Sequence, residues 1–346
     1  MFENSSNTDL SALGEFGLID QITAPAKKVQ QSTITGVGDD AAVIEAGDRY
    51  LLVSSDMLLE GVHFDLSYAP LKHLGYKAVV VNLSDIYAMN GTPRQITVNI
   101  GLSSKFSVEA VEEIYAGIYM ACDQYQVDLI GGDTTASKAG LVLSVTAMGT
   151  VDKDKVAYRK GAKETDLICV TGDLGAAYMG LQVLEREKTV FKGNPEAQPD
   201  LEGFDYILER QLKPEAQRGL IEFFKERQIQ PTSMIDVSDG LASELLHLCK
   251  AGEVGCQVYM QKIPIDHTTA QTADEFNINP LVAAMNGGED YELLFTVPVT
   301  EHEKLQDVPG LHIIGHITEN GSGAFMVDDA GNKSQITAQG WNAFAQ

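Results

Sequence analysis

The sequence predicts an α/β (α+β) protein with two domains, and three observations lead to this prediction. The chain has 346 residues, which exceeds the size at which one hydrophobic core stops growing. Segments with strand-like patterns alternate with segments of helical periodicity in both halves. A polar stretch at 152–165 separates these halves. We therefore place an N-terminal domain with a mixed sheet and flanking helices at 1–153, and a C-terminal α/β domain at 154–346.

The N-terminal domain begins with a predicted hairpin at 39–56. Two segments rich in apolar and β-branched residues, AAVIEAG and RYLLVSSD, surround a turn at Gly47-Asp48. A helix is then expected from Pro70 to about Asn90. Its apolar stripe recurs every three or four residues and includes one carboxylate, the members being Leu71, Leu74, Ala78, Val81, Asp85 and Met89.

The rest of the first half continues the alternation of strands and helices. A strand is expected at 95–102, and a helix follows with Ser107 as its N-cap. The apolar stripe of this helix comprises Val108, Val111, Ile114, Ile118 and Ala121 or Cys122. A short buried strand at 127–130 ends in Gly131-Gly132-Asp133, and a long strand covers 141–151.

The second half starts again with a strand at 166–171 and a helix at 174–186. Segment 187–205 has Gly, Pro and Asn interspersed, which indicates a surface excursion. The four cysteines form no CxxC pair, so we expect buried free thiols in a reducing cytoplasm. The polar N-terminus does not resemble a signal peptide, and no run of 18 apolar residues occurs. These features predict a cytoplasmic protein.

The charge of the chain restricts its partners. Forty-nine acidic residues against 25 basic ones give a formal net charge of −24. Such a charge repels nucleic acids and anionic membranes, and no basic patch compensates for it. We therefore expect neither nucleic acid nor membrane as a partner. An anionic substrate would need divalent cations between itself and this acidic protein.

Five turns that carry aspartates are the candidate functional elements. They contain Asp39 and Asp40, Asp56, Asp85, Asp133, and Asp236 with Asp239. An isolated Asp in such a turn is more often a cap or turn residue than a ligand. Asp85 differs, because a carboxylate on a buried helical stripe costs several kcal/mol unless a cation or strong donors compensate for it.

Clustered carboxylates favour a metal-bound phosphate. Two carboxylates about 4 Å apart repel each other by about 4 kcal/mol at an effective dielectric near 20, and a cation removes this repulsion. Mg²⁺ bridges carboxylates to phosphates, with Ca²⁺ as the competing cation. DVSDG does not fit an EF-hand loop, because Gly240 lies at position five instead of six. The Walker A, HRD and DFG motifs are absent, so an ATP site would be of another kind.

The ordered motif set resembles the thiamine-monophosphate kinase family across nearly the whole chain. The motifs are GVGDDAAV, SSDMLLEGVHF, NLSDIYAMNGTP, LIGGDTT, RKGAKETDLICVTGDLG, IDVSDGL and GGEDYELLF. This family is part of a wider ATP-using group that includes aminoimidazole ribonucleotide synthetase and selenophosphate synthetase. The combination of EGVHF and GGEDYELLF resembles the kinase branch. The AMNGTP segment departs from the family's commoner AMGA-x-P form.

The resemblance implies roles for individual residues. Several Mg²⁺ ions would be held around the ATP phosphates by Asp39, Ser54, Ser55, Asp56, Asp85, Asp133, Asp236 and Asp239. The nucleotide would contact Tyr115, Gly132, Asp133, Arg159 and Ser238, and thiamine monophosphate would contact His63, Glu289 and Trp341. Asp85 and Arg159 would have the catalytic roles. Taken alone, His63 is more often a surface or satisfied histidine than a ligand contact, and Trp341 could equally be a partly buried tail anchor.

The resemblance also implies a reaction and an assembly. The γ-phosphoryl group of ATP would pass in line to thiamine monophosphate, giving thiamine diphosphate. Two chains would pair their N-terminal sheets in a dimeric β-barrel, which hides sheet edges. Two alternatives remain open: a synthetase of the same group with another acceptor, or a non-catalytic protein that binds metal or a phosphorylated metabolite.

Overall fold

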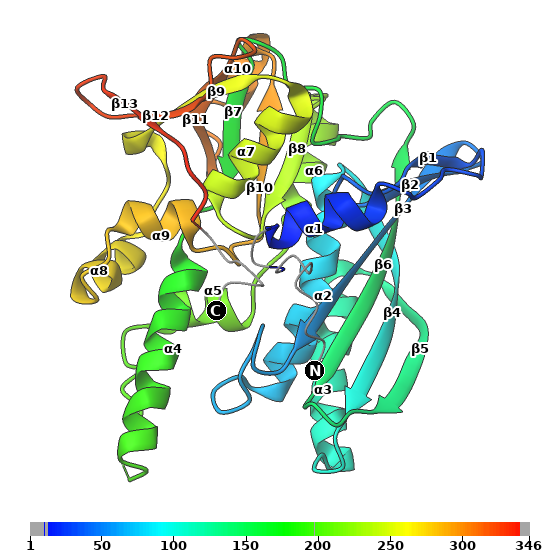
Figure 1. Ribbon diagram of the computed structural model, residues 1–346, viewed down its shortest axis with the longest axis vertical. Helices are drawn as coiled ribbons and strands as arrows, with labels where there is room; N and C mark the ends of the chain where they lie inside the picture. Colours follow the sequence, from blue (N-terminus) through cyan, green and yellow to red (C-terminus); the bar gives the residue numbers. More distant parts are fainter. Residues whose placement is uncertain (1–9, 11–12, 197, 340–346) are drawn as a thin grey trace, which may run out of the picture.

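The fold contains two β-sheets with helices packed on them (Figure 1). The structure is a computed structural model that describes residues 10, 13–196 and 198–339. It confirms the predicted mixed α/β class. No helix in the described part of the chain is both long and apolar enough to cross a membrane. The four cysteines are buried and free, as predicted.

The first sheet has six strands in the order β1-β2-β3-β6-β4-β5. Its strands are β1 (Thr33–Thr35), β2 (Ala42–Ala46), β3 (Arg49–Leu59), β4 (Thr92–Leu102), β5 (Asp128–Ala136) and β6 (Val142–Asp152). Only β4 and β5 pair in parallel, so the sheet is mixed, as predicted. Within one chain this sheet is open, with β1 and β5 at its edges. The described residues of one chain therefore form no closed barrel.

The hairpin expected at 39–56 is confirmed. Strands β2 and β3 pair antiparallel, with Ala46 opposite Arg49. The turn between them contains Gly47 at a φ of 68°, a conformation that glycine adopts without steric cost. This hairpin places Asp40 just before one strand and Asp56 within the other.

Helices α2 (Leu71–Ala88) and α3 (Val108–Tyr125) pack against each other. They approach closely where both carry glycine: a Cβ on Gly75 would lie 1.9 Å from the Ile114 carbonyl oxygen, and one on Gly117 would lie 1.8 Å from that of Lys72. The predicted N-cap of α3 is confirmed, since Ser107 accepts a hydrogen bond from the Ala110 amide. Val108, expected on the apolar stripe, is instead 70% exposed.

Helix α2 differs from the amphipathic helix that its sequence predicts. It contacts β3, β4 and β6 of the first sheet and β8 (Ser233–Val237) of the second, so nearly all of its sides are buried (Figure 1). Ser84 and Ile86 are buried, whereas Asp85 between them is only partly buried. Its carboxylate lies between Val81 and Met89, both buried members of the predicted stripe, at the place where α2 reaches a cavity.

Strand β5 corrects the prediction of a short buried strand at 127–130. The strand continues to Ala136 and contains Gly131-Gly132-Asp133, which therefore is not a turn at a strand end. Almost every residue of β5 is exposed, because it is an edge strand that pairs only with β4.

The second sheet has seven strands in the order β13-β12-β9-β11-β7-β10-β8. They are β7 (Leu167–Thr171), β8 (Ser233–Val237), β9 (Gly255–Tyr259), β10 (Glu292–Val297), β11 (Leu311–Thr318), β12 (Ala324–Val327) and β13 (Lys333–Gln335). Only β9 and β12 pair in parallel. Strand β7 confirms the strand predicted at 166–171.

The remaining helices surround the second sheet and the junction of the two halves (Figure 1). They are α1 (Gly14–Thr23), α4 (Ala176–Gly193), α5 (Asp205–Leu212), α6 (Arg218–Arg227), α7 (Leu241–Gly252), α8 (His267–Glu275), α9 (Pro280–Asn286) and α10 (His302–Leu305), with 3₁₀ turns η2 (Met260–Lys262) and η3 (Val299–Glu301). Helix α4 confirms the helix expected at 174–186 but runs on to Gly193, so the predicted surface excursion begins in a helix. One apolar core joins α2 to Met234 of β8 and Phe295 of β10.

Candidate active site

A cavity of about 830 Å³ is lined by residues from both halves of the chain. Helix α2 contributes Val81 and Asp85 to its wall, and β3 contributes Asp56. The second half contributes the loops after β8 and before β10. The remaining lining residues used below are Glu15 of α1, His63, Asp236, Ser238, Asp239, Glu289 and Tyr291.

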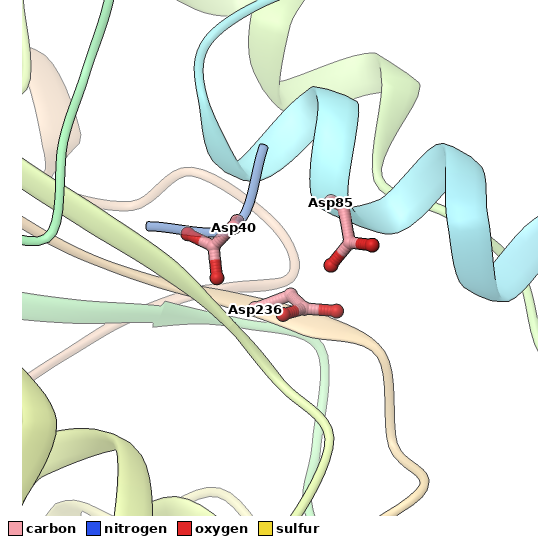
Figure 2. Close-up of side chains that lie close together, drawn as sticks. All are labelled: Asp40, Asp85 and Asp236. Carbon is pink, nitrogen blue, oxygen red and sulfur yellow. The ribbon is translucent and has the colours of Figure 1, made fainter. Parts of the chain in front are cut away.

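Three carboxylates converge beside this cavity. Asp40 precedes β2, Asp85 is on α2 and Asp236 is on β8, and each offers an oxygen within 4.8 Å of the others. Figure 2 shows the three side chains lying close together on three separate segments. Residues separated by as many as 196 positions therefore form one acidic group, which we call the carboxylate triad.

The electrostatics of the carboxylate triad fit a bound cation. Burial, followed by the charges of Asp56 and Asp236, raises the pKa of Asp85 well above its usual value. Burial also raises the pKa of Asp236 to about 7, and the charge of Asp40 adds to this effect. A divalent cation would remove the repulsion that favours these protonated forms.

An unpaired oxygen in the carboxylate triad supports the same conclusion. Asp40 is 8% exposed. Its Oδ1 accepts hydrogen bonds from Arg159, whereas no described residue donates a hydrogen bond to its buried Oδ2. A buried carboxylate oxygen without a donor is costly. Mg²⁺ prefers carboxylate oxygens as ligands, so the three side chains fit this ion.

Arg159 links the turn at Asp39 and Asp40 to the second half of the chain. Its Nη2 lies 2.6 Å from Asp40 Oδ1 and its Nε lies 3.1 Å away. Its backbone amide donates to Asp39 Oδ1 at 2.9 Å. Asp39, which the family resemblance implies as a metal ligand, thus contacts the backbone of Arg159, and its neighbour Asp40 is in the carboxylate triad.

The two serines of β3 point to different surroundings. Ser54 donates a hydrogen bond to Asp85 Oδ2. Ser55 Oγ lies 3.0 Å from Thr146 Oγ1 and donates to the Val145 carbonyl, so it bonds within the sheet. Asp56 is in the cavity wall, and its backbone amide donates to Asn82 Oδ1 at 2.8 Å. Asp56 is exposed toward the cavity, and desolvation by the surrounding protein raises the pKa of its carboxyl.

The loop after β8 adds further predicted residues to the cavity. Ser238 and Asp239 both line it. Burial raises the pKa of Asp239 to about 6, and the charges of Glu15 and Glu289 contribute. Glu244 of α7 is 3% exposed and accepts a hydrogen bond from the Asp239 amide at 3.0 Å. This buried carboxylate thus fixes the loop.

The cavity wall also holds His63 and Glu289. The Leu59 amide donates to His63 Nδ1 at 3.0 Å, which leaves Nε2 to carry the proton of the neutral ring. Burial lowers the pKa of His63, which favours the neutral ring. Glu289 accepts hydrogen bonds from Lys77 and from the Tyr291 hydroxyl.

Three predicted nucleotide contacts do not reach this cavity in one chain. Tyr115 is on α3, where its ring packs at 6.1 Å from that of Tyr119. Gly132 and Asp133 are on the edge strand β5, separated from β3 by β6 and β4. Trp341 lies outside the described residues.

The sequence reasoning assigned no role to Lys77, Tyr291, Glu244 or Glu15. Lys77 had a signal that was overlooked: it precedes Asp85 by eight residues, with Val81 midway, so all three lie on one helical face. The sequence pattern favoured a turn role for Asp40. Two adjacent aspartates do not indicate which side chain faces the cavity, so the pattern could not identify Asp40 as the member of the carboxylate triad.

Comparisons with known proteins agree with this geometry. The family model "AIR synthase related protein, N-terminal domain" matches residues 38–151. A thiamine-monophosphate kinase from Aquifex aeolicus is 33% identical over 336 residues, covering 97% of this chain and 99% of that protein. One from Bacillus subtilis is also 33% identical, covering 96% and 100%.

Solved structures extend the similarity to three dimensions. AaThiL complexed with AMPPCP and TMP matches with a TM-score of 0.83 and 31% identity, covering 98% of this chain and 100% of that one. The hydrogenase maturation protein HypE in complex with ATP matches with a TM-score of 0.67 at 16% identity, covering 97% of this chain and 95% of that one. At that identity the likeness to HypE concerns the fold alone.

Proposed function

We propose that this chain, which belongs to the thiamine-monophosphate kinase family, transfers the γ-phosphoryl group of ATP to thiamine monophosphate and so forms thiamine diphosphate. The observation that carries the proposal is the full-length similarity to these kinases together with the carboxylate triad beside the cavity. The related structure that contains AMPPCP, an analogue of ATP, and TMP supports both substrates.

Several Mg²⁺ ions are proposed to bind at the acidic end of the cavity. Asp40, Asp85 and Asp236 would be the central ligands, with Asp56 and Asp239 from the adjoining wall. Ser54 is placed to orient Asp85, and Ser55 and Asp39 are proposed to contribute from the same region. When bound, the ions supply the positive charge that allows phosphates to enter an acidic cavity.

The reaction needs little covalent chemistry from the chain. A phosphate oxygen of the acceptor forms a bond to the γ-phosphorus as the bond from that phosphorus to the β,γ-bridging oxygen breaks, and ADP leaves. The acceptor oxygen is already anionic, so no general base is required. The chain must hold the two phosphates in line and compensate their charge. Arg159 is proposed to act on the nucleotide from its position beside Asp40.

The neutral His63 and the carboxylate of Glu289 are proposed to bind the acceptor at the other end of the cavity. A carboxylate suits the thiazolium cation of thiamine monophosphate, and a neutral imidazole can donate from Nε2. Trp341 is proposed as a stacking partner for the same ligand. Ser238 is proposed to contact the nucleotide.

We also propose a homodimer and a cytoplasmic location, with domains at 1–153 and 154–346. The exposed edge strand β5 supports the dimer, because an unpaired strand edge invites pairing with another chain. Met57 on β3 and Ile130 on β5 add exposed apolar surface, at 52% and 57% exposure. Tyr115, Gly132 and Asp133 are proposed to act on nucleotide in this assembly.

A coupled assay of ADP release tests the proposal. We expect release to require both thiamine monophosphate and Mg²⁺, and phosphorus NMR of the product to show a diphosphate. ADP release that depends on a formylglycinamidine-type ribonucleotide instead would identify a synthetase. Binding of thiamine monophosphate in calorimetry with no ADP formed would identify a non-catalytic protein.

A further inference from the structure

We propose that Lys77 is a positioning residue for the acceptor, holding the Glu289 carboxylate at the acceptor end of the cavity. The inference rests on the proposed function and adds a residue to it. Lys77 does not line the cavity of about 830 Å³; it lines a small neighbouring pocket that shares His63 and Gln211 with it, and its contact with the larger cavity runs through Glu289.

The contacts of Lys77 identify its partner. Its side chain is 6% exposed, and lysine is rarely so buried without a paired anion. The Nζ atom donates to the Gln211 carbonyl at 2.9 Å and to Glu289 Oε2. Lys77 is on α2, Gln211 is on α5 and Glu289 is in the loop before β10. One ammonium group therefore joins three segments, and two of them, through Gln211 and Glu289, line the cavity.

Glu289 is held at both carboxylate oxygens. Oε2 accepts from Lys77, and Oε1 accepts from the Tyr291 hydroxyl at 3.1 Å. Its backbone amide donates to the Ser238 carbonyl at 2.6 Å. Both Glu289 and Tyr291 have positive φ, at 63° and 52°. Non-glycine residues keep such conformations only when their surroundings enforce them, and this occurs often at functional sites.

The charge of Lys77 has a specific use in this cavity. The wall already carries the carboxylates of Glu15, Asp56, Asp239 and Glu289. The acceptor presents a thiazolium cation and, a few bonds away, a phosphate anion. An uncompensated Glu289 would repel that phosphate or turn away toward solvent. With Lys77 behind it, the carboxylate stays in one place and its net field on the phosphate is reduced.

Helix α2 also fixes how far this pair lies from the carboxylate triad. Lys77, Val81 and Asp85 follow one another at intervals of four residues on the same helical face. Eight residues of helix rise by about 12 Å. Since Asp85 belongs to the metal end and Lys77 holds the acceptor end, one rigid buried helix sets the spacing between the two.

A double-mutant cycle tests the proposal by steady-state kinetics. The variants are Lys77→Met, Glu289→Gln and the combination of both, with Lys72→Met as the control for the loss of an exposed charge on the same helix. We expect Lys77→Met to raise KM for thiamine monophosphate by about tenfold or more while KM for ATP is unchanged. In the Glu289→Gln background the same change should have no further effect. Lys72→Met should match the wild type.

Two results would overturn the inference. One is a Lys77→Met variant whose KM values for acceptor and ATP rise together. The other is a double variant whose increase in KM for thiamine monophosphate equals the product of the increases in the two single variants. Should Lys77→Met fail to fold, the comparison of the double variant with Glu289→Gln still decides, because the pair removed together leaves no unpaired buried charge. A wild type without turnover refutes the proposed function, whereas an active wild type with an unaffected Lys77→Met variant refutes only this inference.

Discussion

The hydroxyl of Ser84 donates a 2.7 Å hydrogen bond to Oδ2 of Asp236. Ser84 is on α2 and Asp236 is on β8, so this bond joins the central helix to the second sheet. The next residue of α2, Asp85, accepts from Ser54 of the first sheet. Through these two consecutive residues, α2 is hydrogen-bonded to both sheets beside the carboxylate triad. The geometry of the site therefore depends on β3, α2 and β8 together.

Replacing Asp85 with Asn is expected to reduce kcat by about 10²- to 10³-fold at saturating Mg²⁺. The midpoint of thermal unfolding in EDTA should be unchanged or higher, because one of three mutually repelling carboxylates has been removed. Kinetics and calorimetry on the same preparation measure both. Near-normal turnover would refute the role of Asp85.

Asp40 and Asp39 are expected to differ although they are adjacent. Asp40→Asn should raise the Mg²⁺ concentration for half-maximal activity by about 10- to 100-fold, because Asp40 supplies a carboxylate to the triad. Asp39→Asn should have a smaller effect, because Asp39 contacts the Arg159 backbone amide. Mg²⁺ titrations of the two variants provide the comparison. The opposite order would favour Asp39 as the ligand.

Asp290 is expected to make stability depend on pH. It is 1% exposed, and burial raises its pKa to about 7 from 3.8. Between these values the folded state binds more protons than the unfolded state, so the free energy of unfolding falls as pH rises from about 4 to about 7. Over that interval one such group contributes at most about 1.4 kcal/mol per pH unit.

Urea unfolding across this pH range, in EDTA, checks the expectation. Asp290→Asn should remove its share of the slope, whereas Asp274→Asn, at an exposed position on α8, should leave the slope unchanged. If the free energy of unfolding of Asp290→Asn falls with pH as steeply as that of the wild type, the proton uptake belongs to other carboxylates.

Gly117→Ala is expected to destabilise the protein by about 3 kcal/mol or more, because the new Cβ would lie 1.8 Å from a backbone oxygen of α2. Gly219→Ala on α6 is the matched control, since its Cβ meets nothing within 4 Å. That change should stabilise the protein by about 0.5–1 kcal/mol. Urea denaturation measures both values. Equal stability of the two variants would contradict the close packing of α2 and α3.

Ile130→Asp on β5 is expected to weaken the proposed homodimer, because it places a charge on the exposed edge strand. Val299→Asp changes an apolar side chain of similar exposure, 51%, far from β5 in the sequence. Light scattering should show a dimer for the wild type and for Val299→Asp, and a larger monomer fraction for Ile130→Asp. A wild-type monomer would refute the dimer.

The sequence determined most local elements, because their signals are local. The hairpin turn at Gly47, the Ser107 cap and strand β7 were predicted from turn chemistry, capping and apolar runs, and the structure confirms them. The motif order was also sufficient to identify the family, which the relatives confirm. The acidic turns were recognised as candidates because aspartates, several of them next to glycine, occur in separate short motifs along the chain.

Only the tertiary structure decided which side chains meet. Helical periodicity reveals the buried face of a helix when only one side is covered. Helix α2 is covered on nearly all sides, so its sequence pattern could not show which residues face the cavity. The choice between Asp39 and Asp40 depends on the orientation of one turn against Arg159. Lys77 and Glu289 are 212 residues apart, and only the folded chain brings their opposite charges together.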